Sequence, residues 1–148
     1  MPIEDKIKQT KFRNEYHRLL ANLFYQYNGL INEQQKILKP FGLSLQQHNL
    51  LSILRGQYPK AASIHLIKER MLDQNSDVSR LVDRLLKKKL LSRKICPKDR
   101  RQVDVIITED GLNLLKKIDT HAQQIDALVS GLSTEEAAIM NNLLDKIR

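Results

Sequence analysis

The segment from Asp77 to Ile107 constrains the fold more than any other part of the chain. It begins with apolar residues at three- and four-residue steps, the period of a helix with one buried face. A short run that ends at Pro97, a charged tip and a second run of β-branched residues around Asp104 follow. This order predicts an amphipathic helix followed by a two-stranded hairpin.

Positive charge is concentrated in the same part of the chain. Residues 75–101 contain ten Lys and Arg against three Asp, a net charge of +7, whereas the whole chain carries +8. The last forty residues have a net charge of −3. A local cationic stripe is typical of a surface that binds phosphate groups. A solvated helix face beside a polar hairpin is the alternative interpretation of the same charges.

Length and composition are those of an ordinary globular domain spanning residues 1–148. The 148 residues include only five Gly and four Pro, with no low-complexity tract, so we expect an ordered and mainly helical chain. A single Cys cannot form an internal disulfide. The N-terminus lacks an apolar signal region, and no run approaches the ~18 apolar residues of a membrane span. We therefore expect a cytoplasmic protein that makes no contact with a membrane.

Helical periodicity predicts further helices before the hairpin. The first is expected from about Lys6 to Leu38 and the second over residues 46–55. Ser63 is expected to cap a third. The basic helix, expected from about Ser76 to Leu90, completes a helix-turn-helix.

Two more helices are expected after the hairpin. Thr108 begins one that apolar spacing extends to about Ser130, and Ser133 and Glu136 form a capping box for the last. The predicted fold class is therefore mainly α with a small β-wing, a winged helix-turn-helix over residues 43–108. Residues 6–38 and 109–148 carry apolar stripes longer than so small a core can cover. We expect these flanking helices to form a homodimer about a two-fold axis.

The run DVSRLVDRLLKKKLLSRKICPKDRRQVDVIITEDGLNLL resembles the core of the MarR family of bacterial winged-helix transcription regulators. The segments QQHNLLSIL and SIHLIKER fall where that family has its second and third helices, so the resemblance covers nearly the whole chain. The most specific part is the Asp-Arg-Arg tip with the strand and Thr-Glu-Asp-Gly that follow it. The resemblance implies a regulator, with repression the expected mode, that binds a pseudo-palindromic operator in double-stranded DNA.

The resemblance also implies which residues bind DNA. The start of the basic helix would reach base edges in the major groove with Asn75, Ser76, Asp77, Ser79, Arg80 and Arg84. The wing would contribute Lys98, Asp99, Arg100 and Arg101. Arg101 would enter the minor groove and Asp99 would hold it in place. The alternative for Asp99 is a plain turn residue.

The chain departs from the family pattern at two places. Lys89 stands where the family commonly has the Gly that ends the recognition helix, so this helix either runs on or ends in a strained residue. Residues 72–75 replace a turn that contains Gly in many members, with Asn75 or Ser76 as the expected cap.

A pocket for a small anionic or phenolic ligand is a further implication of the resemblance. It would lie between the dimerisation helices and the winged helix. The candidates to line it are Tyr16, His17, Tyr27, His48 and Arg55. Ordinary packed or surface roles are the alternative for each.

Other chemistry has little support in the sequence. Cys96 lies beside Lys94 and offers a redox role, but oxidation-sensing members of the family have their reactive Cys in the first helix. The four His show no metal-ligand spacing, so we expect neither a metal nor another cofactor. No GxSxG, Walker or GxGxxG motif occurs, so we expect no enzyme. A winged helix that binds protein, or that coats DNA without sequence choice, is the alternative function.

Overall fold

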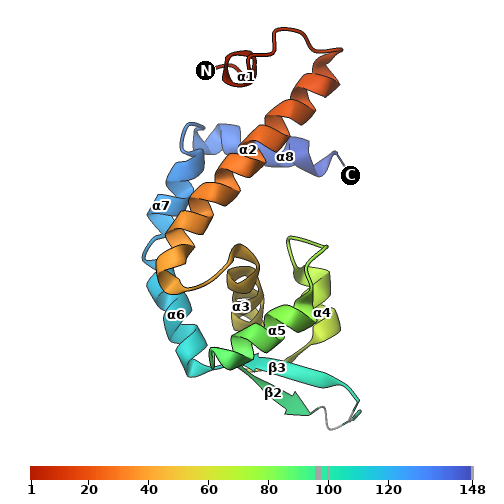
Figure 1. Cartoon of the computed structure of the whole chain (residues 1–148), viewed down its shortest axis with the longest axis vertical. Coiled ribbons are helices and arrows are strands. Elements are labelled where there is room, and N and C mark those ends of the chain that lie inside the picture. Colours follow the sequence, from red (N-terminus) through yellow and green to blue (C-terminus); the bar gives the residue numbers. More distant parts are fainter. Residues whose placement is uncertain (96–97, 100, 148) are drawn as a thin grey trace.

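The computed structural model describes residues 1–95, 98–99 and 101–147, and Figure 1 labels the α-helices and the two strands of the hairpin. The helices are α1 (Ile3–Ile7), α2 (Glu15–Leu38), α3 (Leu45–Gln57), α4 (Ile64–Arg70), α5 (Val78–Lys87), α6 (Glu109–Asp119), α7 (Ala122–Asp126) and α8 (Thr134–Asp145). Short 3-10 helices are η1 (Lys39–Phe41) and η2 (Ala127–Val129), and the strands are β1 (Ala62–Ser63), β2 (Leu91–Ile95) and β3 (Val103–Ile107). Helices with one small antiparallel sheet confirm the predicted fold class.

The prediction of one helix from Lys6 to Leu38 is wrong at its start. Lys8 has a left-handed backbone with φ 53°, and the Asn14 side chain accepts a hydrogen bond from the His17 N–H at 3.0 Å. Because the Asn14 side chain satisfies a backbone N–H of the first turn, it fixes the start of α2 at Glu15. The spacing of apolar residues does not predict such a cap. The end of α2 at Leu38 is as predicted.

α3 and α4 confirm the second and third predicted helices. Ser44 and Gln47 form a capping box that begins α3, whose Leu50 and Leu51 are fully buried. Ser63 caps α4 as expected, because its Oγ accepts from the Leu66 N–H at 3.1 Å.

The sheet has the strand order β1-β3-β2 with antiparallel pairing throughout. The register of the predicted hairpin runs from Leu91 opposite Ile107 to Ile95 opposite Val103. We call β2, β3 and the residues between them the wing. β1 was not expected, because two residues are too few to show the alternation of a strand.

α5 is shorter than the predicted helix over residues 76–90. Asp77 caps it by accepting from the Arg80 N–H, so the prediction of Asn75 or Ser76 as the cap is wrong. Lys89 ends the helix with φ 60°, which decides between the two expected outcomes in favour of the strained residue. The Leu90 N–H donates to Leu85 O at 3.1 Å and the Lys89 N–H to Leu86 O at 2.9 Å, the pair of bonds of a Schellman motif.

The expected single helix from Thr108 to Ser130 is interrupted. Thr108 caps α6 as predicted, but α6 ends at Asp119, and α7 and η2 follow a turn. The Thr120 hydroxyl donates to Lys117 O at 2.6 Å, a local bond that competes with helix continuation. The Ser133–Glu136 capping box of α8 is confirmed.

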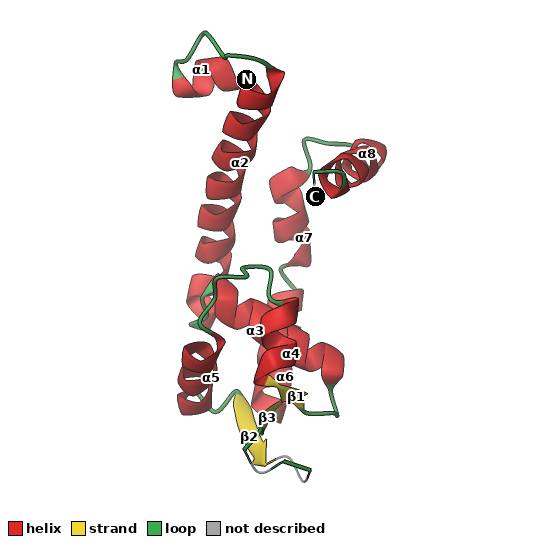
Figure 2. Ribbon diagram, turned by 90° about the vertical axis from the view of Figure 1, so that its right-hand side faces the viewer, coloured by secondary structure: helices red, strands yellow, loops and turns green. Residues whose placement is uncertain are grey.

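The buried core lies among α3, α4, α5, α6 and the sheet, at one end of an elongated molecule (Figure 2). α1 and α8 lie toward the other end, and α8 has no buried residue. Among residues 1–95, 98–99 and 101–147, no helix has both the length and the apolar character that crossing a membrane requires.

Gly111 in the first turn of α6 has no room for a side chain. A Cβ there would lie 2.6 Å from Ile107 Cγ1 and would also meet the backbone oxygen of Leu90. We expect Gly111→Ala to lower the free energy of unfolding by about 1–3 kcal/mol, the usual penalty for overpacking a core. Urea denaturation followed by circular dichroism at fixed protein concentration measures this change.

Gly56→Ala is the matched control. Gly56 lies in α3 with open space around the position of a Cβ. The substitution should leave stability unchanged or raise it by up to about 1 kcal/mol. Equal effects of the two substitutions would contradict this account of Gly111.

Candidate nucleic-acid interface

One face of α5 is buried and the opposite face is exposed. Val78, Val82 and Leu85 lie in the core, where α5 contacts α3, α4 and β2. The exposed residues are Asp77, Ser79, Arg80, Asp83, Arg84 and Lys87. α5 and the wing occupy the same end of the molecule in both views (Figures 1 and 2). A cationic helix face is therefore presented beside a hairpin.

The residues before α5 differ in how available they are. Asn75 is exposed, and its backbone N–H donates to Asp73 Oδ1 at 2.9 Å. Ser76 is half-buried, with a buried Oγ that has no hydrogen-bond partner among the described residues. The Asp77 carboxylate is engaged as the helix cap. Ser79, Arg80 and Arg84 are thus the predicted contact residues whose side chains extend from the exposed face of α5.

The tip of the wing is held by its own turn. Asp99 Oδ1 accepts from the Arg101 N–H at 2.9 Å, and Asp99 O accepts from the Gln102 N–H at 3.0 Å. Asp99 therefore fixes the main chain at Arg101, while the side chains of Lys98, Asp99 and Arg101 are exposed. Arg100 and Cys96 lie outside the described residues.

An ion pair links the wing to α5. The Arg93 guanidinium in β2 donates to Asp83 Oδ1 in α5, and both side chains are more than half exposed. Sequence reasoning grouped Arg93 with the basic stripe and missed this contact. In the sequence, this ion pair is indicated only by two opposite charges ten residues apart, one on each side of a predicted turn.

Lys88 is a second member of the stripe with a structural role. Its Nζ donates to Gly42 O and, at 3.2 Å, to Oε1 of Gln47, a side chain that is only 6% exposed. This ammonium ties the C-terminal end of α5 to the turn between α2 and α3. The charge count alone could not separate Lys88 from the lysines that face solvent.

A cleft of about 750 Å³ lies between α2, α3 and the loop that leads into α5. Of the five candidates to line a ligand pocket, Tyr27 and His48 line it, and Asp73 and Asn75 from the loop do so as well. Tyr16, His17 and Arg55 do not line it. Arg55 instead pairs with Asp119 of α6 at 2.7 Å.

Burial lowers the pKa of His48 below its ordinary value. The positive charge of Arg55 acts in the same direction, and the carboxylate of Asp119 opposes both. The imidazole is therefore neutral near pH 7 and offers a hydrogen bond, not a charge, to the cleft. Among the described residues, no group of three or more His, Cys, Asp or Glu side chains is arranged to hold a metal ion.

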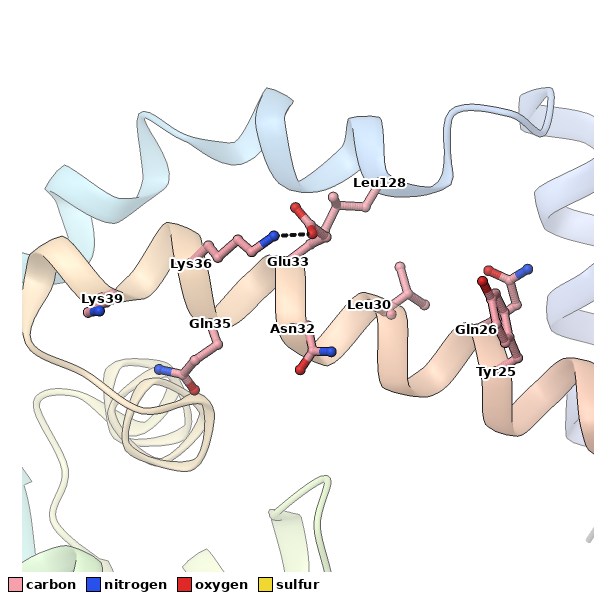
Figure 3. Close-up of a pocket in the computed structure, with 10 residues that line it drawn as sticks. Tyr25, Gln26, Leu30, Asn32, Glu33, Gln35, Lys36, Lys39 and Leu128 are labelled. Atoms are coloured by element: carbon pink, nitrogen blue, oxygen red, sulfur yellow. Dashed lines mark hydrogen bonds and ion pairs between the residues drawn. The ribbon is translucent and has the colours of Figure 1, made fainter. Parts of the chain in front are cut away.

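A second, more open hollow of about 530 Å³ lies along α2 (Figure 3). Tyr25, Asn32 and the paired Glu33 and Lys36 project from α2, and Leu128 of η2 closes one side. Gly29 also lines it and has open space where a Cβ would stand. Among the residues that the structure describes, no contact requires a Gly at this helical position.

Large apolar side chains are exposed along α2 and α8. On α2 they are Tyr16, Leu19, Leu20, Phe24, Tyr25 and Tyr27, and on α8 they are Ile139, Met140, Leu143 and Leu144. A contiguous row of exposed apolar side chains on a helix is typical of an interaction surface, whereas single exposed apolar residues are common on any protein.

Comparison with known proteins identifies this arrangement. The model of a family described as the MarR family matches residues 41–102. The HTH-type transcriptional regulator MhqR of Bacillus subtilis (strain 168) is 31% identical over 133 residues, which cover 88% of this chain and 89% of MhqR. This chain belongs to the MarR family. It is thus a transcriptional regulator with a winged helix of the DNA-binding type, in a family that is not one of enzymes.

Solved structures of MarR-family proteins share the fold. A mutant MarR from E. coli complexed with operator DNA has a TM-score of 0.80 at 22% identity, covering 93% of this chain and 99% of its own. BpsR of Bordetella bronchiseptica, whose DNA binding is regulated by 6-hydroxynicotinic acid, has a TM-score of 0.77 at 27% identity. That match covers 88% of this chain and 98% of BpsR.

Proposed function

We propose that this MarR-family protein binds specific sites in double-stranded DNA as a homodimer and acts as a repressor whose DNA affinity a small molecule changes. One observation carries the DNA-binding part. The exposed cationic face of α5 and the exposed tip of the wing lie at the same end of the molecule and are joined by the Arg93–Asp83 pair. A single surface made of both elements can then meet adjacent grooves of one duplex.

Each side chain has a task suited to its chemistry. Ser79, Arg80 and Arg84 lie on a helix of a width that fits the major groove, where Arg and Ser can hydrogen-bond to base edges. Arg101 is suited to a narrow minor groove, because its planar guanidinium sheds water more readily than an ammonium does. Lys87 and Lys98 neutralise phosphates and fix the register.

Arg101→Ala should weaken binding to a preferred duplex by about tenfold, without unfolding the protein, because Asp99 holds the main chain and not the Arg101 guanidinium. The duplex is first obtained by selection from a random library. Titration by fluorescence anisotropy over a range of salt concentrations, with circular dichroism as a folding check, measures the effect.

Random duplex provides the comparison. A sequence-specific regulator prefers the selected duplex well beyond the common electrostatic attraction. Equal affinity for every duplex would instead favour a protein that coats DNA without sequence choice. Arg70→Ala is the matched control, because it removes a positive charge from α4, outside the proposed interface. It should leave the preference for the selected duplex unchanged.

The homodimer rests on the exposed apolar faces of α2 and α8. We assign residues 6–38 and 109–148 to dimerisation and residues 43–108 to DNA binding. A two-fold axis would bring the α2 and α8 faces of two chains together and set two α5 helices about 34 Å apart, one turn of duplex. The pair would then read a pseudo-palindromic site. The open position at Gly29 is consistent with a close approach by a second chain.

Leu20→Glu and Leu143→Glu should each shift the protein from dimer to the 17.2 kDa monomer at micromolar concentration, because each buries a charge in an apolar contact. Sedimentation velocity measures the change. Tyr58→Glu, which places the same charge on an exposed residue outside α2 and α8, should remain dimeric. A wild-type protein that sediments only as monomer would contradict the dimer.

The cleft lined by Tyr27 and His48 is the proposed effector site. A phenol and a neutral imidazole at an apolar wall suit a small aromatic acid or phenol, and 6-hydroxynicotinic acid regulates the relative BpsR. Asp73 and Asn75 belong to this cleft and also to the loop that leads into Asp77, the cap of α5. A ligand that prefers one position of this loop would change the position of α5 and so its affinity for DNA.

4-Hydroxybenzoate, which is both anionic and phenolic, is the probe for this site. We expect it to weaken operator binding, and His48→Leu to lower its affinity about tenfold through the lost hydrogen bond. Isothermal titration calorimetry measures binding, and His65→Leu on the exposed face of α4 is the control. Binding that does not change when His48 is replaced would remove the cleft from the proposal.

A further inference from the structure

Two apolar side chains on the wing are exposed. Ile95, the last residue of β2, is 72% exposed, and Val103, the first residue of β3, is 38% exposed. They stand directly opposite each other in the antiparallel register. We call them the apolar wing pair. The two pairs nearer the base of the wing differ, because Leu91 and Ile107 are buried and Val105 is buried opposite Arg93.

The apolar wing pair lies on the side of the sheet that faces α5. Side chains alternate along a strand, so Leu91, Arg93 and Ile95 point to the same side. Arg93 on that side reaches Asp83 of α5. Ile95 and Val103 therefore continue the core-facing side of the hairpin beyond the edge of the core, next to the exposed face of α5.

The surroundings of the pair indicate what covers it. Lys98 and Arg101 at the tip of the same hairpin are exposed, so an occupant must be anionic close to a small apolar surface. Two side chains are far too small for a protein partner, since stable protein interfaces bury about 1,200 Å² or more. The backbone of DNA meets both conditions, because deoxyribose rings between charged phosphates form the walls of the minor groove.

We propose that Ile95 and Val103 pack against the deoxyribose rings that separate the groove read by α5 from the groove entered by the wing. Proteins that bind the minor groove frequently place apolar side chains against the DNA there. This inference rests on the proposed DNA binding and adds a contact that carries no charge. Stiffening of the hairpin by a cross-strand pair is the competing explanation.

Ile95→Thr and Val103→Thr separate the two explanations, since Thr is β-branched and retains the strand preference of Ile and Val. On the selected duplex, each variant should bind about 3- to 10-fold more weakly at every salt concentration. The slope of log affinity against log salt should be unchanged, because no counterion is released by an apolar contact. Lys98→Ala should instead reduce that slope by about 1.

Hydroxyl-radical footprinting gives a readout specific to sugars. The Thr variants should lose protection at the sugars under the wing and keep it at those flanking α5. Tyr58→Thr, a loss of exposed apolar surface outside the wing, should change neither footprint nor affinity.

Three results would overturn the inference. They are wild-type affinity in both Thr variants, a reduced salt slope, and faster amide hydrogen exchange across β2 and β3 that accounts for the loss of binding. If the wild-type protein prefers no duplex, the proposed function itself fails. If it does and the Thr variants match it, only the apolar contact is wrong.

Discussion

Burial of Val78, Val82 and Leu85 determines how the rest of the interface is presented. Each of these side chains contributes about 1.5–3 kcal/mol when it leaves water. An exposed ion pair such as Arg93–Asp83 contributes about 1 kcal/mol or less. The rotation of α5 about its axis is therefore set by its apolar stripe, and Arg80 and Arg84 face solvent because they lie opposite that stripe. The ion pair adjusts the wing against a helix that is already oriented.

Polar contacts at the two ends of α5 connect it to the loop that lines the cleft and to the segment between α2 and α3. At its start, the Asp77 cap follows a loop that lines the cleft. At its end, Lys88 binds Gly42 in the turn between α2 and α3 and also Gln47 in the first turn of α3, which is almost fully buried. A movement of α2 or of the cleft-lining loop would thus reach α5 through short hydrogen-bonded paths. This connection is the physical basis of the proposed effect of a ligand in the cleft on DNA affinity.

The distribution of apolar surface divides the molecule in a similar way. At the end with the sheet, apolar side chains fill a core, and the apolar wing pair extends beyond it. At the other end, α8 has no buried residue, and α2 has only Leu38. The single chain is well packed where it presents α5 and incompletely packed where its helices leave large side chains in water. The second chain of the proposed homodimer would supply the missing contacts.

The sequence by itself determined the helix-turn-helix, the hairpin, the caps at Ser63 and Ser133 and the location of the positive charge. These depend on periodicity and on hydrogen bonds between residues only a few positions apart. Only the tertiary structure decided that Lys88 binds Gln47 and that Arg55 binds Asp119, 64 residues away at the last residue of α6. It also decided which candidates line the cleft. Such pairs form because packing brings distant segments together. No local sequence pattern predicts which charged side chain will form a polar contact and which will face solvent.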